Sequence, residues 1–165
     1  MWKPEQRRAA DRTGVRYPSD LSDAGKKIKG RKRHILVDTL GLLLNVVVHP
    51  ADIQDRDGAF HLLRRARRLF PFIERIFADG GYAGGKMAMT VWRTGAWSLQ
   101  IVKRSEAAGF EVLPKRWIVE RTFAWISRNR RLARDFERYA TTVAAFIRLA
   151  MIRIMLKRLA ANASS

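Results

Sequence analysis

The sequence contains no cysteine, and this absence removes several classes of chemistry at once. Disulfide frameworks, thiolate zinc sites and cysteine nucleophiles are all excluded. The amino terminus has no apolar run, so it lacks the pattern of a secretory signal. The longest apolar stretch, residues 143–156, is interrupted by Arg148 and Arg153 and is too short to span a bilayer. These features are compatible with a reducing cytoplasm and predict a buried helix at 143–156.

Acidic residues are scarce as well. Asp and Glu number 15 against 33 Lys and Arg, which gives a formal net charge of +18 and a pI near 11.5. Such an excess repels itself unless a polyanion is near, so nucleic acid is the favoured partner, ahead of an anionic membrane. A soluble basic protein without such a partner is the plain alternative. The 165 residues suffice for one domain with its own core.

The order of patterns along the chain predicts a mixed α/β layer sandwich. Residues 1–24 are polar and turn-rich, and we expect them to form a loosely attached arm. The elements expected after it are a hairpin with strands at 34–38 and 42–48, a helix at 57–70, a strand at 73–79, a helix at 85–93, a strand at 98–103 and, from Pro114 onward, helices with a break near 138–140.

Asp79 is the first residue that could carry chemistry. It stands at the tip of the strand at 73–79, directly before Gly80 and Gly81. A side chain at such a place can approach a ligand or a metal, because the adjoining backbone is flexible. The sequence therefore predicts a functional carboxylate at this end of the strand.

Glu120 is the second candidate, because its helix can be drawn on a wheel at about 100° per residue. The core face then holds Ile118, Val119, Thr122, Trp125 and Ile126. The opposite face is a polar stripe of Arg116, Glu120, Ser127 and Arg131. The plain alternative is an ordinary salt bridge between Glu120 and Arg116, four residues earlier.

These two carboxylates suit phosphodiester chemistry. Mg²⁺ is bound by carboxylates, waters and substrate phosphates, and a pair of such ions can clamp the attacking and leaving oxygens. Asp79 and Glu120 are thus the candidate ligands of Mg²⁺ or Mn²⁺. The residues expected to hold the phosphate backbone are Arg116, Arg128, Arg130, Arg131 and Arg134, with further non-specific attraction from Lys26, Lys27, Lys29, Arg31, Lys32 and Arg33.

Four segments, at 31–38, 51–58, 78–82 and 117–125, resemble bacterial insertion-sequence transposases, and more narrowly the group named after the fifth insertion sequence. The resemblance runs from about 25 to 159. It implies an RNase H-like mixed sheet flanked by helices, with an Asp-Asp-Glu triad, a divalent metal and double-stranded DNA as partner. It divides the chain into an arm at 1–24, a catalytic domain at 25–160 with a helical C-terminal region, and a tail at 161–165.

By this resemblance Asp79 is the second acid of the triad, Glu120 is the third, and Arg116 is the arginine expected before that glutamate. Leu113 stands where a tyrosine is expected, and Ser127 where a lysine is. Arg128, Arg130 or Arg131 can replace that lysine electrostatically.

The strand that carries the first acid is not found. Residues 17–24 instead resemble the opening of the family protein, joined directly to its catalytic segment, which indicates an internal deletion. Asp20 and Asp23 belong to that opening, and Asp38 lies at the opposite sheet edge, roughly 15 Å from Asp79. We therefore expect a sheet without its central strand and a transposase defective in Mg²⁺-dependent cleavage and strand transfer.

Two other functions stay open at this point. One is an inactive DNA-binding remnant that interferes with an intact transposase by joining its oligomer. The other is a basic RNA-associated protein, which the acidic motifs disfavour. His34, His49 and His61 lack ligand spacing and are expected to have structural or solvent-exposed roles. The tryptophans at 92, 97, 117 and 125 are expected to be core anchors rather than base-stacking platforms. By resemblance, the protein is bacterial and cytoplasmic, joining the nucleoid when it binds DNA.

Overall fold

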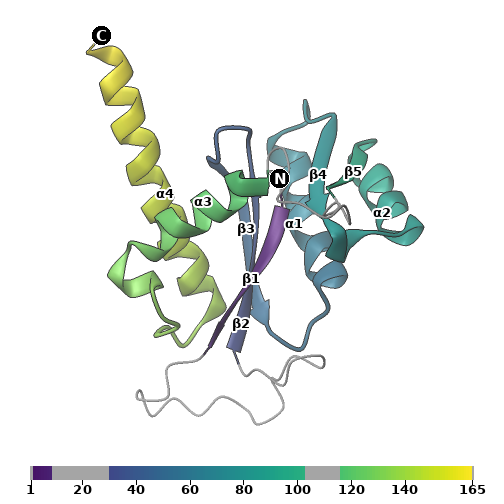
Figure 1. The fold of residues 1–165 in the computed structure, drawn as a ribbon, viewed down its shortest axis with the longest axis horizontal. Helices are drawn as coiled ribbons and strands as arrows, with labels where there is room; N and C mark the ends of the chain where they lie inside the picture. Colours follow the sequence, from purple (N-terminus) through teal and green to yellow (C-terminus); the bar gives the residue numbers. More distant parts are fainter. Residues whose placement is uncertain (1, 9–29, 103–115, 165) are drawn as a thin grey trace, which may run out of the picture.

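The computed structural model describes residues 2–8, 30–102 and 116–164; for residues 2–8, Arg56 and Arg116 it describes the backbone alone. A five-stranded sheet lies at the centre, in the order β3-β2-β1-β4-β5. Helices α3 and α4 lie on one side of it, and α1 and α2 lie on the other (Figure 1). This three-layer arrangement agrees with the mixed α/β sandwich that the sequence predicts.

The strands are β1 (Trp2–Arg8), β2 (Gly30–Val37), β3 (Leu43–Pro50), β4 (Arg75–Asp79) and β5 (Ser98–Val102). The helices are α1 (Asp55–Leu69), α2 (Gly85–Gly95), α3 (Arg116–Ser127) and α4 (Ala140–Ala163), with short 3-10 helices η1 (Gly80–Tyr82) and η2 (Arg130–Leu132). The chain between α3 and α4 is not α-helical, so the break predicted near 138–140 begins about ten residues earlier.

Strand β1 corrects the expectation of an empty central position. Residues 2–8 lie between β2 and β4, antiparallel to β2 and parallel to β4. They are polar and include Pro4, so nothing in their own pattern indicates a strand; the backbones on either side supply the partners. The rest of the expected arm, residues 9–24, lies outside the described residues.

Alternation along β2 builds a core on each face of the sheet. Ile35 and Val37 pack on α3 and α4, whereas Leu36 packs on α1 and α2. Successive side chains of a strand point to opposite faces, so one apolar run serves both layers. Each such side chain, when fully buried, contributes roughly 1.5–3 kcal/mol to stability.

Helix α4 is only partly the buried helix that the apolar run at 143–156 predicts. Its first half supplies Val143, Ile147 and Met151 to the core. Its second half extends past the body of the protein (Figure 1), and Ile152, Leu156 and Leu159 are exposed there, as is Leu149 just before it.

The tryptophans also divide into buried and exposed residues. Trp97 is 1% exposed and anchors the core on the α1 side of the sheet. Trp92 and Trp117 are exposed, which corrects the prediction of core anchors for both. Trp125 is half-buried and packs against the core on the α3 side of the sheet. The guanidinium of Arg121 lies 4.2 Å from the ring centroid of the exposed Trp117 and 4.8 Å from that of Trp125, which allows cation–π contacts with both rings.

Candidate active site

Strand β4 ends at Asp79, as the sequence predicts. The Asp79 carboxylate accepts a hydrogen bond of 3.1 Å from the backbone N–H of Gly81 and so caps η1. Gly80 and Gly81 are exposed, whereas Tyr82, the last residue of η1, is fully buried. The cap and the buried tyrosine hold the carboxylate at the tip of an inner strand.

Glu120 is exposed on α3, and the core face predicted for that helix is confirmed. Ile118, Val119 and Thr122 are buried on the sheet side. The Thr122 hydroxyl donates to the carbonyl of Gly41 at 2.8 Å, in the turn between β2 and β3. Gly41 has φ +79°, and a Cβ atom there would lie 2.9 Å from the Thr122 Oγ1, so the turn requires glycine.

The fold brings α3, β1 and β4 to one region of the sheet. Ile118 of α3 and Phe77 of β4 line the same cavity, and α3 contacts β1. Trp2 pairs with Ala78, so continuing the register by one residue places Lys3 level with Asp79. A lysine thus occupies the central-strand position next to Asp79, and the only acidic residue of β1 is Glu5, two residues further along.

Asp38 lies at the other end of β4. Leu36 pairs with Trp2, so Asp38, two residues later, is level with Ile76 rather than with Asp79. Its carboxylate accepts hydrogen bonds of 2.8 Å from the backbone N–H groups of Leu40 and Leu42. Asp38 therefore stabilises the turn after β2, and it is no substitute for the first acid.

The described residues provide only part of a divalent-metal site. Asp79 and Glu120 offer the hard oxygen ligands that Mg²⁺ and Mn²⁺ prefer. Within residues 2–8, 30–102 and 116–164, however, no three His, Asp or Glu side chains gather in a group that could hold a metal ion. With Lys3 level with Asp79, these residues do not fit a complete triad, and metal binding by Asp79 and Glu120 stays a prediction.

The basic run at the start of β2 corrects the expected DNA contacts. Arg31, Lys32 and Arg33 are 7%, 4% and 1% exposed, so their side chains lie inside the protein. Arg31 donates to the carbonyls of Glu137 and Arg138 at 2.6 and 2.8 Å.

The other two cations are engaged as well. Lys32 reaches the Ile53 carbonyl at 2.9 Å and the Asp55 carboxylate at 3.1 Å, and Arg33 donates to the Leu132 carbonyl at 3.0 Å. The run thus fastens β2 to the helical layers on both faces. Lys26, Lys27 and Lys29 lie outside the described residues.

The arginines after α3 are at the surface, where they can reach a phosphate. Arg128, Arg130 and Arg131 are exposed, and Arg131 also pairs with Glu137 at 2.9 Å. For Arg116 the side chain is not described. The sequence prediction of a cationic surface after α3 is thus compatible with the structure.

A basic groove runs between the end of α3 and the second half of α4. Its volume is about 460 Å³. The residues lining it are Trp125, Arg128, Asn129, Ala150, Arg153, Ile154, Lys157, Arg158 and Ala161. Sequence reasoning missed Arg153, Lys157 and Arg158, although the spacing of 153 and 157 already places them on one face of a helix.

Two buried histidines lie between β2, β3 and α1. The rings of His34 and His49 stack with centroids 4.5 Å apart, and the Tyr82 hydroxyl lies 3.2 Å from the Nδ1 of His34. Burial lowers the pKa of His34 to about 3, with the charges of His49 and Lys32 acting in the same direction. Burial also lowers the pKa of His49. The buried pair and the exposed His61 both agree with the structural or solvent-exposed roles expected for the three histidines.

Known proteins resemble this chain over most of its length. A family model described as "Transposase DDE domain" matches residues 2–155. A protein assigned as the transposase of insertion sequence element IS402 from Burkholderia cepacia is 32% identical over 128 residues, which cover 73% of this chain and 60% of that protein. The chain thus spans about three fifths of that curated relative. No solved structure gives a significant match. Among the described residues, no helix is both long and apolar enough to cross a membrane.

Proposed function

Because the chain belongs to the family of transposase DDE domains, we propose that it is an insertion-sequence protein that binds double-stranded DNA but is defective in strand cleavage and transfer. The observation that carries this proposal is the position of Lys3. The central strand offers a lysine level with Asp79, at the place where the family resemblance calls for the first acid.

Asp79 and Glu120 would hold Mg²⁺ or Mn²⁺ in an intact site, and the metal would supply an activated oxygen nucleophile and charge neutralisation at the phosphate. A positive charge at position 3 works against both, because it repels the ion that the two carboxylates attract. The residues of this chain supply less than an intact metal site would. They present two carboxylates on β4 and α3, and cations further along α3 and α4.

The DNA contact that we propose is the surface after α3 together with the basic groove. Arg128 belongs to both, and Arg130 and Arg131 extend the cationic surface along η2. Arg153 and Lys157 are exposed on the α4 side of the groove. Cations in such a row neutralise successive phosphates, and the counterions released from the DNA provide most of the binding free energy.

The test separates binding from chemistry. Mobility-shift titrations should show binding to duplex DNA carrying the sequences that flank this gene, with weaker binding to duplex RNA of the same sequence. Incubation with Mg²⁺ or Mn²⁺ should leave that DNA uncut. Metal-dependent cleavage or joining that is lost in Asp79→Ala would refute the defect. Equal affinity for RNA would favour the RNA-associated alternative.

A second function has its own support in α4. Leu149, Ile152, Leu156 and Leu159 are exposed and spaced by three, four and three residues, the pattern of a helix-pairing seam. This stripe favours association with another helix, as required of a remnant that joins the oligomer of an intact transposase. Purified chain should then inhibit transposition by the full-length relative, and Leu156→Lys should abolish that inhibition.

A further inference from the structure

The basic groove between α3 and α4 has an aromatic wall. Trp125 lines it from α3 and is half-buried, and the guanidinium of Arg158 on α4 lies 4.8 Å from its ring centroid. The guanidinium of Arg121 lies at the same distance from that centroid. Ala150 and Ile154 add apolar area to the lining. A nucleobase stacks both on an indole and on a guanidinium plane, so this wall offers a flat aromatic ligand two kinds of contact surface.

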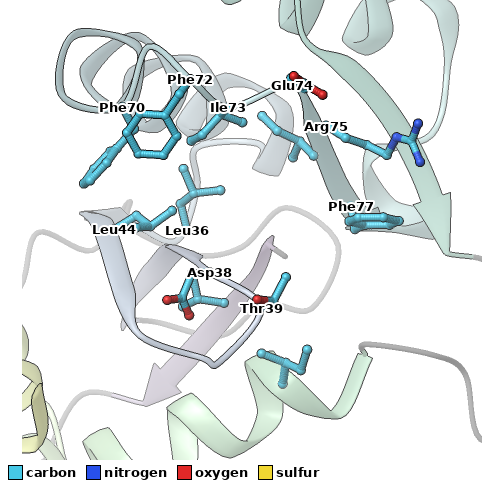
Figure 2. A pocket seen from close by; sticks show the side chains of 13 residues that line it. Leu36, Asp38, Thr39, Leu44, Phe70, Phe72, Ile73, Glu74, Arg75 and Phe77 are labelled. Carbon is cyan, nitrogen blue, oxygen red and sulfur yellow. The ribbon is translucent and has the colours of Figure 1, made fainter. Parts of the chain in front are cut away.

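The rim of the groove is cationic. Arg128 after α3 and Arg153 and Lys157 on α4 belong to the lining and are exposed. Among the described residues that line the groove there is no Asp or Glu. Figure 2 shows the contrast at the cavity beside β4, where the carboxylates of Asp38 and Glu74 belong to the lining. The groove is therefore the cavity that suits an anion such as a phosphate.

Asn129 adds a hydrogen-bond acceptor to the lining of the groove. Its amide nitrogen donates to the backbone carbonyls of Trp125 and Ile126, at 3.2 and 3.1 Å. Because these bonds use the N–H groups of the amide, its oxygen is the atom that can accept from a ligand. An unpaired base presents N–H donors on the edge that pairing would otherwise occupy. The acceptor therefore suits a base that has left its base pair.

The size of the groove suits one nucleotide rather than a duplex. Its volume of about 460 Å³ lies within the range of roughly 300–1,000 Å³ that is usual for small-ligand pockets. A duplex keeps its bases stacked inside and offers a protein phosphates, sugars and base edges. A base enters a protein pocket only after it has left the stack.

Resting on the DNA binding proposed above, we propose that the groove is a site for one unpaired nucleotide of a DNA strand. The base lies against Trp125 with its edge toward Asn129, and the flanking phosphates lie at the cationic rim. Continuity with the proposed DNA surface favours this occupant, because Arg130 and Arg131 come directly after Asn129. A duplex held on that surface delivers a strand end or an opened base pair to the groove.

The test compares two labelled oligonucleotides of equal length. One is a single strand of ten deoxyuridines, and its control keeps every phosphate but has an abasic sugar at each position. Fluorescence anisotropy titration with the full chain should show about tenfold or greater weakening with the abasic strand, because the stacking of the bases is lost. Equal binding of the two strands would overturn the proposal, since the groove would then attract phosphates alone.

A strand of ten uridines separates DNA from RNA as the source of the base. It differs from the deoxyuridine strand only in its 2′-hydroxyl groups, which let a protein distinguish the two nucleic acids. Binding no tighter than that of the deoxyuridine strand agrees with the proposal. Tighter binding of the uridine strand would assign the groove to RNA and overturn it.

Two tryptophan variants locate the bound base. Trp125→Leu removes the indole but keeps an apolar side chain, so it should weaken binding of the deoxyuridine strand about tenfold and that of the abasic strand less than about twofold. Trp117→Leu is the matched control, because Trp117 lies on the same helix and also contacts Arg121 but is not in the groove lining. Thermal unfolding checks that both variants are folded. A folded Trp125→Leu that binds both strands as the unmodified chain does would contradict the proposal.

Photocrosslinking gives a location that does not depend on the stability of a variant. A deoxyuridine strand carrying 5-iododeoxyuridine should attach to Trp125 or to another residue of the groove on irradiation, as read by mass spectrometry of the digested chain. Attachment only to aromatic residues elsewhere, such as Trp92 or Trp117, would overturn the proposal.

The outcomes separate the nucleotide site from the proposed function. Binding of duplex DNA together with equal binding of the deoxyuridine and abasic strands would overturn the nucleotide site and leave the proposed DNA binding intact. Absence of binding to duplex DNA and to both strands would overturn the proposed function, and the nucleotide site with it.

Discussion

Trp2 and Ala78 form the only register pair between β1 and β4 within the described residues, and one residue further along both strands Lys3 comes level with Asp79. Lys3 thus takes the backbone position level with Asp79 in the central strand of the sheet. A positive side chain at this register position is expected to weaken the attraction of the sheet edge for a cation. We therefore expect the residue at position 3 to affect how strongly this sheet edge attracts a divalent metal ion.

Replacing Lys3 by aspartate should create metal affinity. The change Lys3→Asp removes a positive charge and adds a carboxylate level with Asp79, so three oxygen ligands become available with Glu120. Calorimetric titration with Mn²⁺ should show binding by Lys3→Asp that is at least about tenfold tighter than binding by the unmodified chain.

The control for this prediction is the double variant Lys3→Asp with Asp79→Ala, in which the gained affinity should vanish. Lys3→Ala separates loss of the positive charge from gain of a ligand. If Lys3→Ala and Lys3→Asp bind Mn²⁺ equally, the new carboxylate does not reach the metal.

Gly58→Ala should destabilise the fold. A Cβ atom at Gly58 would overlap the Nε2 of His49 and lie 2.9 Å from the Nε2 of His34, so the α1 helix would have to move away from the stacked pair. Overpacking of this kind costs about 1–3 kcal/mol, read as a lower urea midpoint. Gly85→Ala at the start of α2 is the matched control, because a Cβ atom there would meet nothing within 4 Å, and it should not lower the midpoint.

Stability should fall as the pH drops below 6.5. Because the pKa of His34 is lowered to about 3 in the folded state, the unfolded chain binds more protons between those two values. The stabilisation is complete above pH 6.5 and is lost as the pH falls toward 3. Between pH 7 and pH 5 this one group removes about 2 kcal/mol.

Urea unfolding of His34→Gln measures this contribution. The variant should lose about 2 kcal/mol less between pH 7 and pH 5 than the unmodified chain, whatever its absolute stability. The exposed His61 provides the control, since His61→Gln should leave the pH dependence unchanged. Parallel pH curves for His34→Gln and the unmodified chain would contradict a buried neutral His34.

Removing charge from the basic groove should weaken DNA binding at every sequence. The double change of Arg153 and Lys157 to glutamine removes two exposed cations, so the slope of log affinity against log salt should become shallower by about 1.8. The control is Arg64→Gln with Arg68→Gln on the exposed face of α1, in the opposite helical layer. Equal slopes for both double variants would place the DNA elsewhere.

Local sequence patterns predict the elements that carry the two acids. The apolar run 76–78 followed by Gly80 and Gly81 is enough to end a strand at Asp79, because both signals are local. The wheel drawn from Ile118 gives the buried face of α3, since that face is a regular amphipathic pattern.

Local patterns do not predict the structure of segments whose conformation is determined by contacts with residues distant in the sequence. The charge run containing Arg31 and Arg33 is typical of a solvated DNA-binding segment, but backbone carbonyls at 132, 137 and 138 surround these guanidinium groups inside the fold. The sequence does not predict strand β1, because its residues have no strand pattern of their own. In both cases pairing with distant segments overrides local propensity.

The central position of β1 has a consequence for the order of folding. Strands β2 and β3 form a hairpin, and β4 and β5 are joined through α2, so each half of the sheet rests on contacts between nearby parts of the chain. Among the described strands, β1 alone links the halves, and its partner Ala78 is far away in sequence. Contacts of long sequence separation close slowly, because the loop entropy is lost before they form. We therefore expect the pairing of β1 with β4 to form late in folding, after the two halves of the sheet.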